Sequence, residues 1–295
     1  MVNRNQRAFV WMLTILLSLL SLVACSRSES VPSPSASPPS VSEGTPDSAE
    51  EWLIKGRAAA LKMNKYGFQL QMKQELDGGE KGGSTRVEID MQGRAERNPL
   101  KLDQTIKSVI DGEKSTLRAV VVPDAYYMYL PEYEEWSKLS KDVAAENVAT
   151  LSDYQVNPEQ ALASVQKLGE SLKAERDGKV VTVRYEGVGP EASAFLTELS
   201  KSTLGISVEQ TEIVKSIEVL KLKVIVTLDA EQYWPLSYRI ESDMNIELEP
   251  GVKSTVNQTL AGTYSKHNVT AAITVPKEAQ AALDPDELGK ELGLE

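Results

Sequence analysis

The chain has few of the residues that build the commonest reactive sites. Its 295 residues include 1 Cys and 1 His, which excludes a disulfide framework, a Cys/His zinc site and, if the Cys is consumed by the processing predicted below, a Cys–His catalytic pair. The 32 Lys and Arg are outnumbered by 43 Asp and Glu, so the formal net charge is −11. This acidity argues against binding to nucleic acid, because phosphate contacts need clustered cations. Hydrophobic residues make up 41% of the chain, which is enough for a sizeable core.

The first 25 residues have the pattern of an export signal. Arg4 and Arg7 precede residues 8–24, which carry no charge. The run ends in Leu22, Val23, Ala24 and Cys25, which match the bacterial lipobox. Small residues before the cleavage point fit the signal peptidase, and the Cys25 thiol is the nucleophile that accepts diacylglycerol. We therefore predict a signal peptide at 1–24 and lipidation of Cys25.

An uncleaved anchor helix is the alternative, since the uncharged run is at the lower edge of a bilayer-spanning length. If the signal is removed, at least two acyl chains on Cys25 anchor the protein stably at the outer face of the bacterial cell membrane. The two arginines leave with the signal, which changes the formal net charge from −11 to −13. Such an acidic body is repelled by an anionic membrane surface and is expected to be held away from it.

The residues after Cys25 predict a tether followed by one domain. Residues 26–48 contain 9 Ser and 5 Pro, a composition typical of a disordered linker with polyproline II character. We therefore divide the chain into a signal peptide at 1–24, a lipidated tether at 25–48 and a single domain at 49–295.

The domain shows mainly the alternation of antiparallel strands. Apolar residues recur at every second position in several segments, with turn dipeptides between them. The clearest series are Phe68, Leu70 and Met72; Val87, Ile89 and Met91; Leu100, Leu102 and Ile106; Val181, Val183 and Tyr185; Leu220 to Leu228; Leu236 to Leu248; and Val256, Leu260 and Tyr264. The pattern predicts about ten or eleven strands. Similar Pro-Leu pairs at Pro99 and Pro235 hint at two similar halves.

Helices are expected in only a few places. Ser48 and Glu51 have capping-box spacing, which predicts a helix that continues to about Lys65. Residues 143–151 are weakly helical, Pro158 and Pro190 each favour the first turn of a helix, and residues 276–279 begin a short one. So few helices cannot cover both faces of the sheet. We therefore predict an α+β fold, a curved open antiparallel sheet (a half-barrel) with a few helices packed in its concave face.

No catalytic or metal-binding constellation is recognisable. His267 lies beside Lys266 and Asn268 in a turn-like segment and has no partner motif, so we expect it to be a solvated surface residue. Acidic residues cluster at 132–135 and 284–287 without the spacing of a calcium loop, and there is no Gly-rich phosphate loop. We expect no cofactor, no metal and no enzymatic activity.

Aromatic residues form the one suggestive group. They are Tyr127, Tyr129, Trp136, Trp234 and Tyr238, joined by Met128. On a curved sheet such side chains can line a cavity for acyl chains, and they can equally be cross-strand core pairs. We treat these six residues as candidate cavity residues.

Several segments together resemble a known family. They are the lipobox, the Ser/Pro tether, the Tyr-Tyr-Met-Tyr-Leu run at 126–130 with Glu135-Trp136-Ser137-Lys138-Leu139, and the closing segment 273–279. They resemble a family of uncharacterised Gram-positive lipoproteins that looks like the LolA/LolB and LppX/LprG superfamily. The resemblance implies an open half-barrel with helices inside its curve, and members with known roles carry lipids or lipoproteins there. It carries no catalytic residues to transfer.

Two functions follow as expectations. The first is a membrane-anchored, non-enzymatic lipoprotein that binds a lipid or another hydrophobic ligand in the concavity. The second is an envelope interaction module that has a solid core and contacts a protein partner. An envelope hydrolase is disfavoured, because no triad can be assembled.

Overall fold

The structure is a computed structural model that describes residues 46–79, 83–206, 210–249 and 251–283. The chain divides into two compact units, Met1–Ser40 and Val41–Glu295, and every described residue belongs to the second unit. The predicted signal peptide, Cys25 and nearly all of the predicted tether lie outside the described residues.

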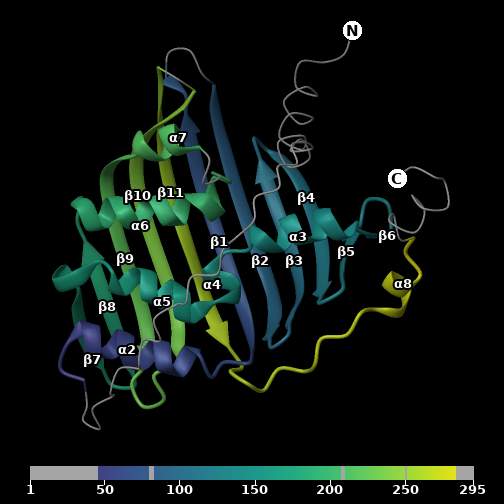
Figure 1. Cartoon of the computed structure of the whole chain (residues 1–295), viewed down its shortest axis with the longest axis horizontal. Coiled ribbons are helices and arrows are strands. Elements are labelled where there is room, and N and C mark those ends of the chain that lie inside the picture. Colours follow the sequence, from purple (N-terminus) through teal and green to yellow (C-terminus); the bar gives the residue numbers. More distant parts are fainter. Residues whose placement is uncertain (1–45, 80–82, 207–209, 250, 284–295) are drawn as a thin grey trace, which may run out of the picture. The chain divides into compact units, whose positions relative to one another are not determined.

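Eleven strands form one antiparallel sheet (Figure 1). Their order is β6-β5-β4-β3-β2-β1-β11-β10-β9-β8-β7, so β6 and β7 are the two edges and the sheet is open. Each half is a meander of strands that follow one another in sequence, and the pairing of β1 with β11 joins the halves. The strands are β1 (Lys65–Asp77), β2 (Ser84–Arg97), β3 (Leu100–Ile110), β4 (Glu113–Val122), β5 (Ala125–Leu130), β6 (Glu135–Lys138), β7 (Lys173–Asp177), β8 (Val180–Glu186), β9 (Glu218–Asp229), β10 (Pro235–Glu249) and β11 (Val252–Ser265).

Seven α-helices and one 3₁₀ turn occur within the described residues. Figure 1 shows α2 to α7 on one face of the sheet, which we call the inner face, while α8 lies beyond β6. The helices are α2 (Ala49–Ala60), α3 (Lys141–Ala149), α4 (Asp153–Val156), α5 (Pro158–Gln166), α6 (Pro190–Thr203), α7 (Thr211–Lys215) and α8 (Lys277–Gln280), and the 3₁₀ turn is η2 (Gly169–Ser171). The predicted fold class, an open antiparallel sheet with helices on one face, is confirmed.

The local signals in the sequence have clear counterparts. The Ser48 side chain caps α2 by accepting a hydrogen bond from the Glu51 N–H at 3.2 Å, as the capping-box spacing predicts. Pro158 and Pro190 occupy the first turns of α5 and α6. Pro99 lies directly before β3 and Pro235 begins β10, so the Pro-Leu echo marks a strand start in both halves.

Helix α2 ends earlier than the sequence predicts, at Ala60 instead of about Lys65. The Asn268 side chain captures the backbone that follows the helix. Its Oδ1 accepts from the Asn64 N–H at 2.8 Å, and its Nδ2 donates to the Lys62 carbonyl at 2.9 Å. A residue more than 200 positions away therefore turns the chain from helix into strand.

Buried aromatic rings lie over glycines at matching places in both halves. Phe68 on β1 is opposite Gly93 on β2, and a Cβ at Gly93 would come within 2.9 Å of the Phe68 ring. Tyr238 on β10 is opposite Gly262 on β11, where a Cβ would meet the Tyr238 hydroxyl at 2.3 Å. Each glycine provides the space in which a large ring lies flat along the inner face.

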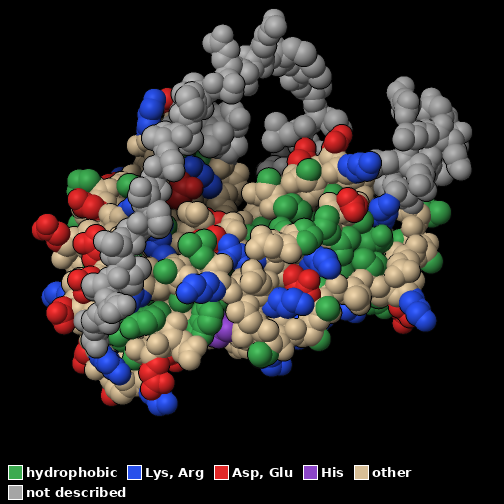
Figure 2. Space-filling view, turned by 60° about the horizontal axis from the view of Figure 1, so that its bottom comes forward, with side chains coloured by type: hydrophobic (Ala, Val, Ile, Leu, Met, Phe, Trp, Pro, Cys, Tyr) green, Lys and Arg blue, Asp and Glu red, His purple; other side chains and the backbone are tan. Residues whose placement is uncertain are grey.

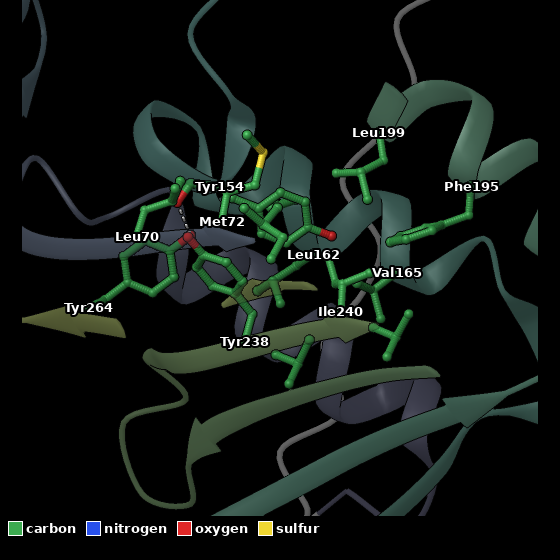
Figure 3. Close-up of a cluster of buried hydrophobic side chains, with 14 of the residues drawn as sticks. Leu70, Met72, Tyr154, Leu162, Val165, Phe195, Leu199, Tyr238, Ile240 and Tyr264 are labelled. Carbon is green, nitrogen blue, oxygen red and sulfur yellow. Dashed lines mark hydrogen bonds between the residues drawn. The ribbon is translucent and has the colours of Figure 1, made fainter. Parts of the chain in front are cut away.

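The short helix α4 is fixed to the sheet by tyrosine hydroxyls. Pro158 has no N–H, so it cannot donate the helical hydrogen bond that the Tyr154 carbonyl would otherwise accept. The Tyr264 hydroxyl donates to that carbonyl instead, at 2.7 Å (Figure 3), and the Tyr66 hydroxyl donates to the next carbonyl, that of Gln155, at 2.9 Å. Burial raises the pKa of Tyr264 far above its usual range, so its hydroxyl keeps the proton that it donates.

A nearly buried ion pair joins the end of β2 to the helices α5 and α2. The Arg97 guanidinium at the end of β2 contacts the Glu159 carboxylate at the start of α5, and it also donates to the Ala60 carbonyl of α2 at 3.0 Å. Both charged side chains are nearly buried, with exposed fractions of 12% and 10%. Helices α2 and α5 pack against each other, and Arg97 links both of them to the sheet through an ion pair and a hydrogen bond.

We predict that Tyr264→Phe destabilises the protein by about 1–3 kcal/mol, because the buried Tyr154 carbonyl loses its only replacement donor. Tyr238→Phe is the matched control, since the buried Tyr238 hydroxyl has no partner within the described part of the chain. Removing it should leave the free energy of unfolding unchanged or slightly raised. Urea unfolding followed by tryptophan fluorescence measures both, and equal losses for the two variants would contradict the assignment.

Candidate functional site

The inner face over β8 to β11 is closed by helices. Side chains of α4, α5 and α6 point onto it, among them Leu162, Val165 and Phe195, which belong to one buried cluster with Ile240 and Tyr238 from β10 (Figure 3). The apolar cavity left between α5 and these strands has a volume of about 10 Å³, room for about one water molecule. An acyl chain does not fit in this cavity.

The inner face over β2 to β4 is covered much less. Met91, Ile106 and Leu117 lie side by side on neighbouring strands. Ile89, two residues before Met91 on β2, points to the same face. All four side chains are only partly buried. We call these four residues the open strip.

Burial along these strands falls toward the open strip. At the other end of the same strands the cross-strand series is fully covered, with exposed fractions of 5% or less; its members are Tyr66, Ala95, Leu102, Val121 and Tyr126. Among the described helices α3 contacts β5 and α4 contacts β1 and β2, and α3 has no buried residue of its own. Figure 2 shows hydrophobic side chains gathered toward the side of the molecule where Figure 1 places β3 to β6.

The open strip offers apolar contact and no acid–base chemistry. The Ser108 and Ser115 hydroxyls, 2.7 Å apart, border it. They form the next inward-facing pair after Ile106 and Leu117 on β3 and β4. An apolar surface with a polar group at one end suits an amphiphile, whose chain displaces water from the strip while its polar end stays hydrated.

The six candidate cavity residues do not come together. Three of them point to the outer face: Tyr127, Tyr129 and Trp136. Tyr129 is paired with Trp136 on β6, and Tyr127 lies two residues before Tyr129 on the same face of β5, while the inner face of β5 carries Met128. Met128 and Tyr238 are on the inner face, but in different halves of the sheet. Trp234 lies in the turn before β10.

Most of the six candidate residues have a packing role. Tyr129 and Trp136 form a ring pair with centroids 5.3 Å apart, and the Arg118 guanidinium lies 5.5 Å from the Trp136 ring centroid. Tyr238 belongs to the core, 4.7 Å from the Tyr154 ring and 5.8 Å from the Tyr264 ring. Met128 is partly buried against the same core.

His267 is not the solvated surface residue that the sequence suggests. Its ring stacks on Trp234 with centroids 5.4 Å apart and an interplanar angle of 9°, and its Nε2 donates to the Pro235 carbonyl at 3.0 Å. Burial lowers the pKa of His267, and the hydrogen bond to Pro235 and the charge of Asp229 offset only part of that effect. The residue joins the end of β11 to the start of β10.

The sequence predicted two of the three strands of the open strip, β2 and β3, but neither β4 nor the strip itself. Met91 and Ile106 were recognisable as strand residues by their alternation, whereas Leu117 stood out by no pattern of its own. One signal in the sequence could have pointed to the strip. Few helices are predicted before residue 141, so few elements are available to cover the strands β2 to β6.

The described residues contain neither a metal-binding cluster nor a membrane-spanning helix. No group of three or more His, Cys, Asp or Glu in that part of the chain could hold a metal ion. None of the helices there is both long and apolar enough to cross a membrane.

Comparison with known proteins places the chain in a family. Residues 48–283 match the model of a family of unknown function, DUF6612. The chain belongs to this family. None of the curated proteins matches this DUF6612 chain.

Solved structures show distant likeness to the DUF6612 chain. A domain from Vibrio parahaemolyticus, titled as outer membrane lipoprotein-sorting, is 9% identical with a TM-score of 0.25, covering 81% of this chain and 97% of its own. A β-barrel-like DUF1849 protein from Brucella abortus is 9% identical with a TM-score of 0.23, covering 68% and 98%. A DUF1329 protein from Desulfovibrio piger is 10% identical with a TM-score of 0.23, covering 75% and 95%. Likeness at these TM-scores carries no argument about function.

We predict that stability falls as the pH drops from roughly 7.5 to 5.5 and that His267→Gln removes most of this fall. The pKa of His267 is depressed in the folded state, so the unfolded chain binds the proton more readily as the pH passes about 6.5. The stability that His267 contributes is therefore present above that pH and lost below it. Urea unfolding at several pH values measures the slope, and an unchanged slope in the variant would contradict the assignment.

Proposed function

We propose that this protein is a lipid-anchored extracytoplasmic protein that binds an apolar or amphiphilic ligand on the open strip and catalyses no reaction. The observation that carries the proposal is the strip itself. The apolar positions of the inner face over β8 to β11 are mostly buried, whereas Ile89, Met91, Ile106 and Leu117 stay partly uncovered within the described structure. The lipobox at Leu22 to Cys25 supports an anchor that keeps the domain near a source of lipid.

The ligand in this proposal lies on the sheet and is not enclosed by it. The cavity between α5 and the strands of the covered half has a volume of only about 10 Å³, so it has no room for an acyl chain. A strip of this kind binds its ligand by burying apolar area, at about 25 cal/mol per Å². Three branched aliphatic side chains next to a flexible methionine accommodate chains of different shape.

We predict that Leu117→Glu lowers labelling of the full chain by a photoactivatable palmitate analogue about tenfold, since a buried carboxylate in the contact costs more than 1.4 kcal/mol. The chain is labelled in intact cells, and the cross-linked peptides are mapped by mass spectrometry. Thr116→Glu is the control, because the neighbouring Thr116 is equally half-buried but faces the outer side of β4. Equal labelling of the two variants, or labels confined to the outer face, would refute the proposal.

The anchor generates its own prediction. Cys25→Ser should move the protein from the membrane fraction into the soluble fraction, because the only thiol of the chain is then absent. Ser26→Ala, at the next residue, should leave the protein in the membrane fraction. Fractionation and immunoblotting measure both, and a Cys25→Ser protein that stays with the membrane would indicate an uncleaved helix.

The second candidate function is an envelope interaction module. It is favoured by the tight packing of the covered half, where the cavity holds no more than about one water. In this case a protein surface covers the open strip in place of a lipid. Cross-linking in intact membranes distinguishes the two, since a module yields a defined protein joined to the strip and no lipid adduct.

A further inference from the structure

A polar groove of about 660 Å³ lies on the outer face of the sheet, opposite the helices. Its floor is formed by β1, β2, β3 and β11, and residues 266–271 form one wall. This wall belongs to the segment that leaves β11 and runs along the strand ends toward α8 (Figure 1). It is held in place by the Arg94 guanidinium, which donates to the Ala271 carbonyl at 3.3 Å, and by the Ile273 N–H, which donates to Glu96 at 2.7 Å.

Arg94 and Asp103, the charged residues on the floor of the groove, are already paired, while the wall adds one further cation, Lys266. Asp103 receives Arg94 at 2.7 Å and Arg118 at 3.1 Å, and its carboxylate is mostly buried. Although burial opposes its ionisation, hydrogen bonds from Arg118 and Arg94 hold the pKa of Asp103 below its usual range. Both guanidinium groups are therefore committed to a resident carboxylate, which leaves them little capacity for an external anion.

Four neutral polar side chains on the floor of the groove are uncommitted. Gln69, Gln92 and Thr105 are direct cross-strand neighbours, and Thr263 extends the series onto β11. Within the described residues none of these four side chains forms a hydrogen bond. The hydroxyl of Thr270, in the wall, is buried and also has no partner there.

The spacing of these groups suits a repeating ligand. Neighbouring strands are about 4.8 Å apart, so the four side chains span roughly 15 Å across the sheet. The same cross-strand series continues through Arg118 and Tyr129 to Trp136, which supplies aromatic surface beyond the groove. Gly67 adds no side chain to the floor and so keeps it open.

We propose that this outer groove binds a neutral oligosaccharide. Amide and hydroxyl side chains donate and accept hydrogen bonds in equal measure, as the hydroxyls of a sugar do. The lining is too polar for an acyl chain, and the paired arginines disfavour an anion. An extended peptide is disfavoured because the floor strands are central, with their backbone groups already paired to neighbouring strands.

The groove and the open strip are independent sites. They lie on opposite faces of the same strands, since Gln92 and Thr105 alternate with Met91 and Ile106 along β2 and β3. Failure of one proposal leaves the other untouched.

Calorimetric titration of the full chain with chitohexaose and cellohexaose, in a zwitterionic detergent without a sugar headgroup, tests the proposal. We expect saturable binding of at least one of the two. Thr105→Val should weaken it about threefold to tenfold, the equivalent of one lost hydrogen bond. Gly67→Val should weaken it at least about tenfold, because the new side chain fills the floor and the only close atom, Ser265 Oγ, can move aside.

Thr116→Val is the matched control, a Thr on the same outer face but outside the groove lining. It should bind as the unmodified chain does, and circular dichroism verifies that every variant is folded. Three results would overturn the proposal: no binding of either oligosaccharide, binding that Thr105→Val and Gly67→Val leave unchanged, or preferential binding of inorganic phosphate or heparin in the same titration.

Discussion

The position of the helical layer depends on how α4 satisfies its backbone. This helix is only four residues long. Pro158, two residues after its end, has no N–H and cannot donate a hydrogen bond back to it. Two buried tyrosine hydroxyls, from Tyr264 on β11 and Tyr66 on β1, take over that task. An unpaired buried carbonyl costs about 1–3 kcal/mol, so the two bonds hold α4 at the seam where the two halves of the sheet meet.

The rest of the arrangement follows from that position. With α4 at the seam, α5 continues away from it onto the second half, where it packs on α2, and the Arg97–Glu159 pair fastens the junction. The covered half becomes solid, while β2 to β4 retain apolar side chains that the helices leave partly uncovered. One sheet thereby carries two chemically different surfaces, an apolar strip on the inner face and a polar groove on the outer face.

Much of the fold could be predicted from local patterns because their physics is local. The alternation at Phe68, Leu70 and Met72 reports a strand with one buried face, and Pro158 reports the first turn of a helix. Predictions failed where a distant partner intervened. The end of α2 is set by Asn268, and His267 is half-buried because Trp234 and Pro235 reach it from the preceding turn.

The sequence by itself determined that this protein has strands with one apolar face, few helices and a single thiol, Cys25, whose lipidation is a prediction from the lipobox pattern. Only the tertiary structure decided which face of each strand the helices cover. Tyr127 and Tyr129 alternate with Met128, and no local rule says which of the two sets points inward. The pairing register of β5 on β4 decides it, because a shift of one residue exchanges the two faces of a strand. The register of β4 depends in turn on the strands beyond it, so the choice belongs to the whole sheet.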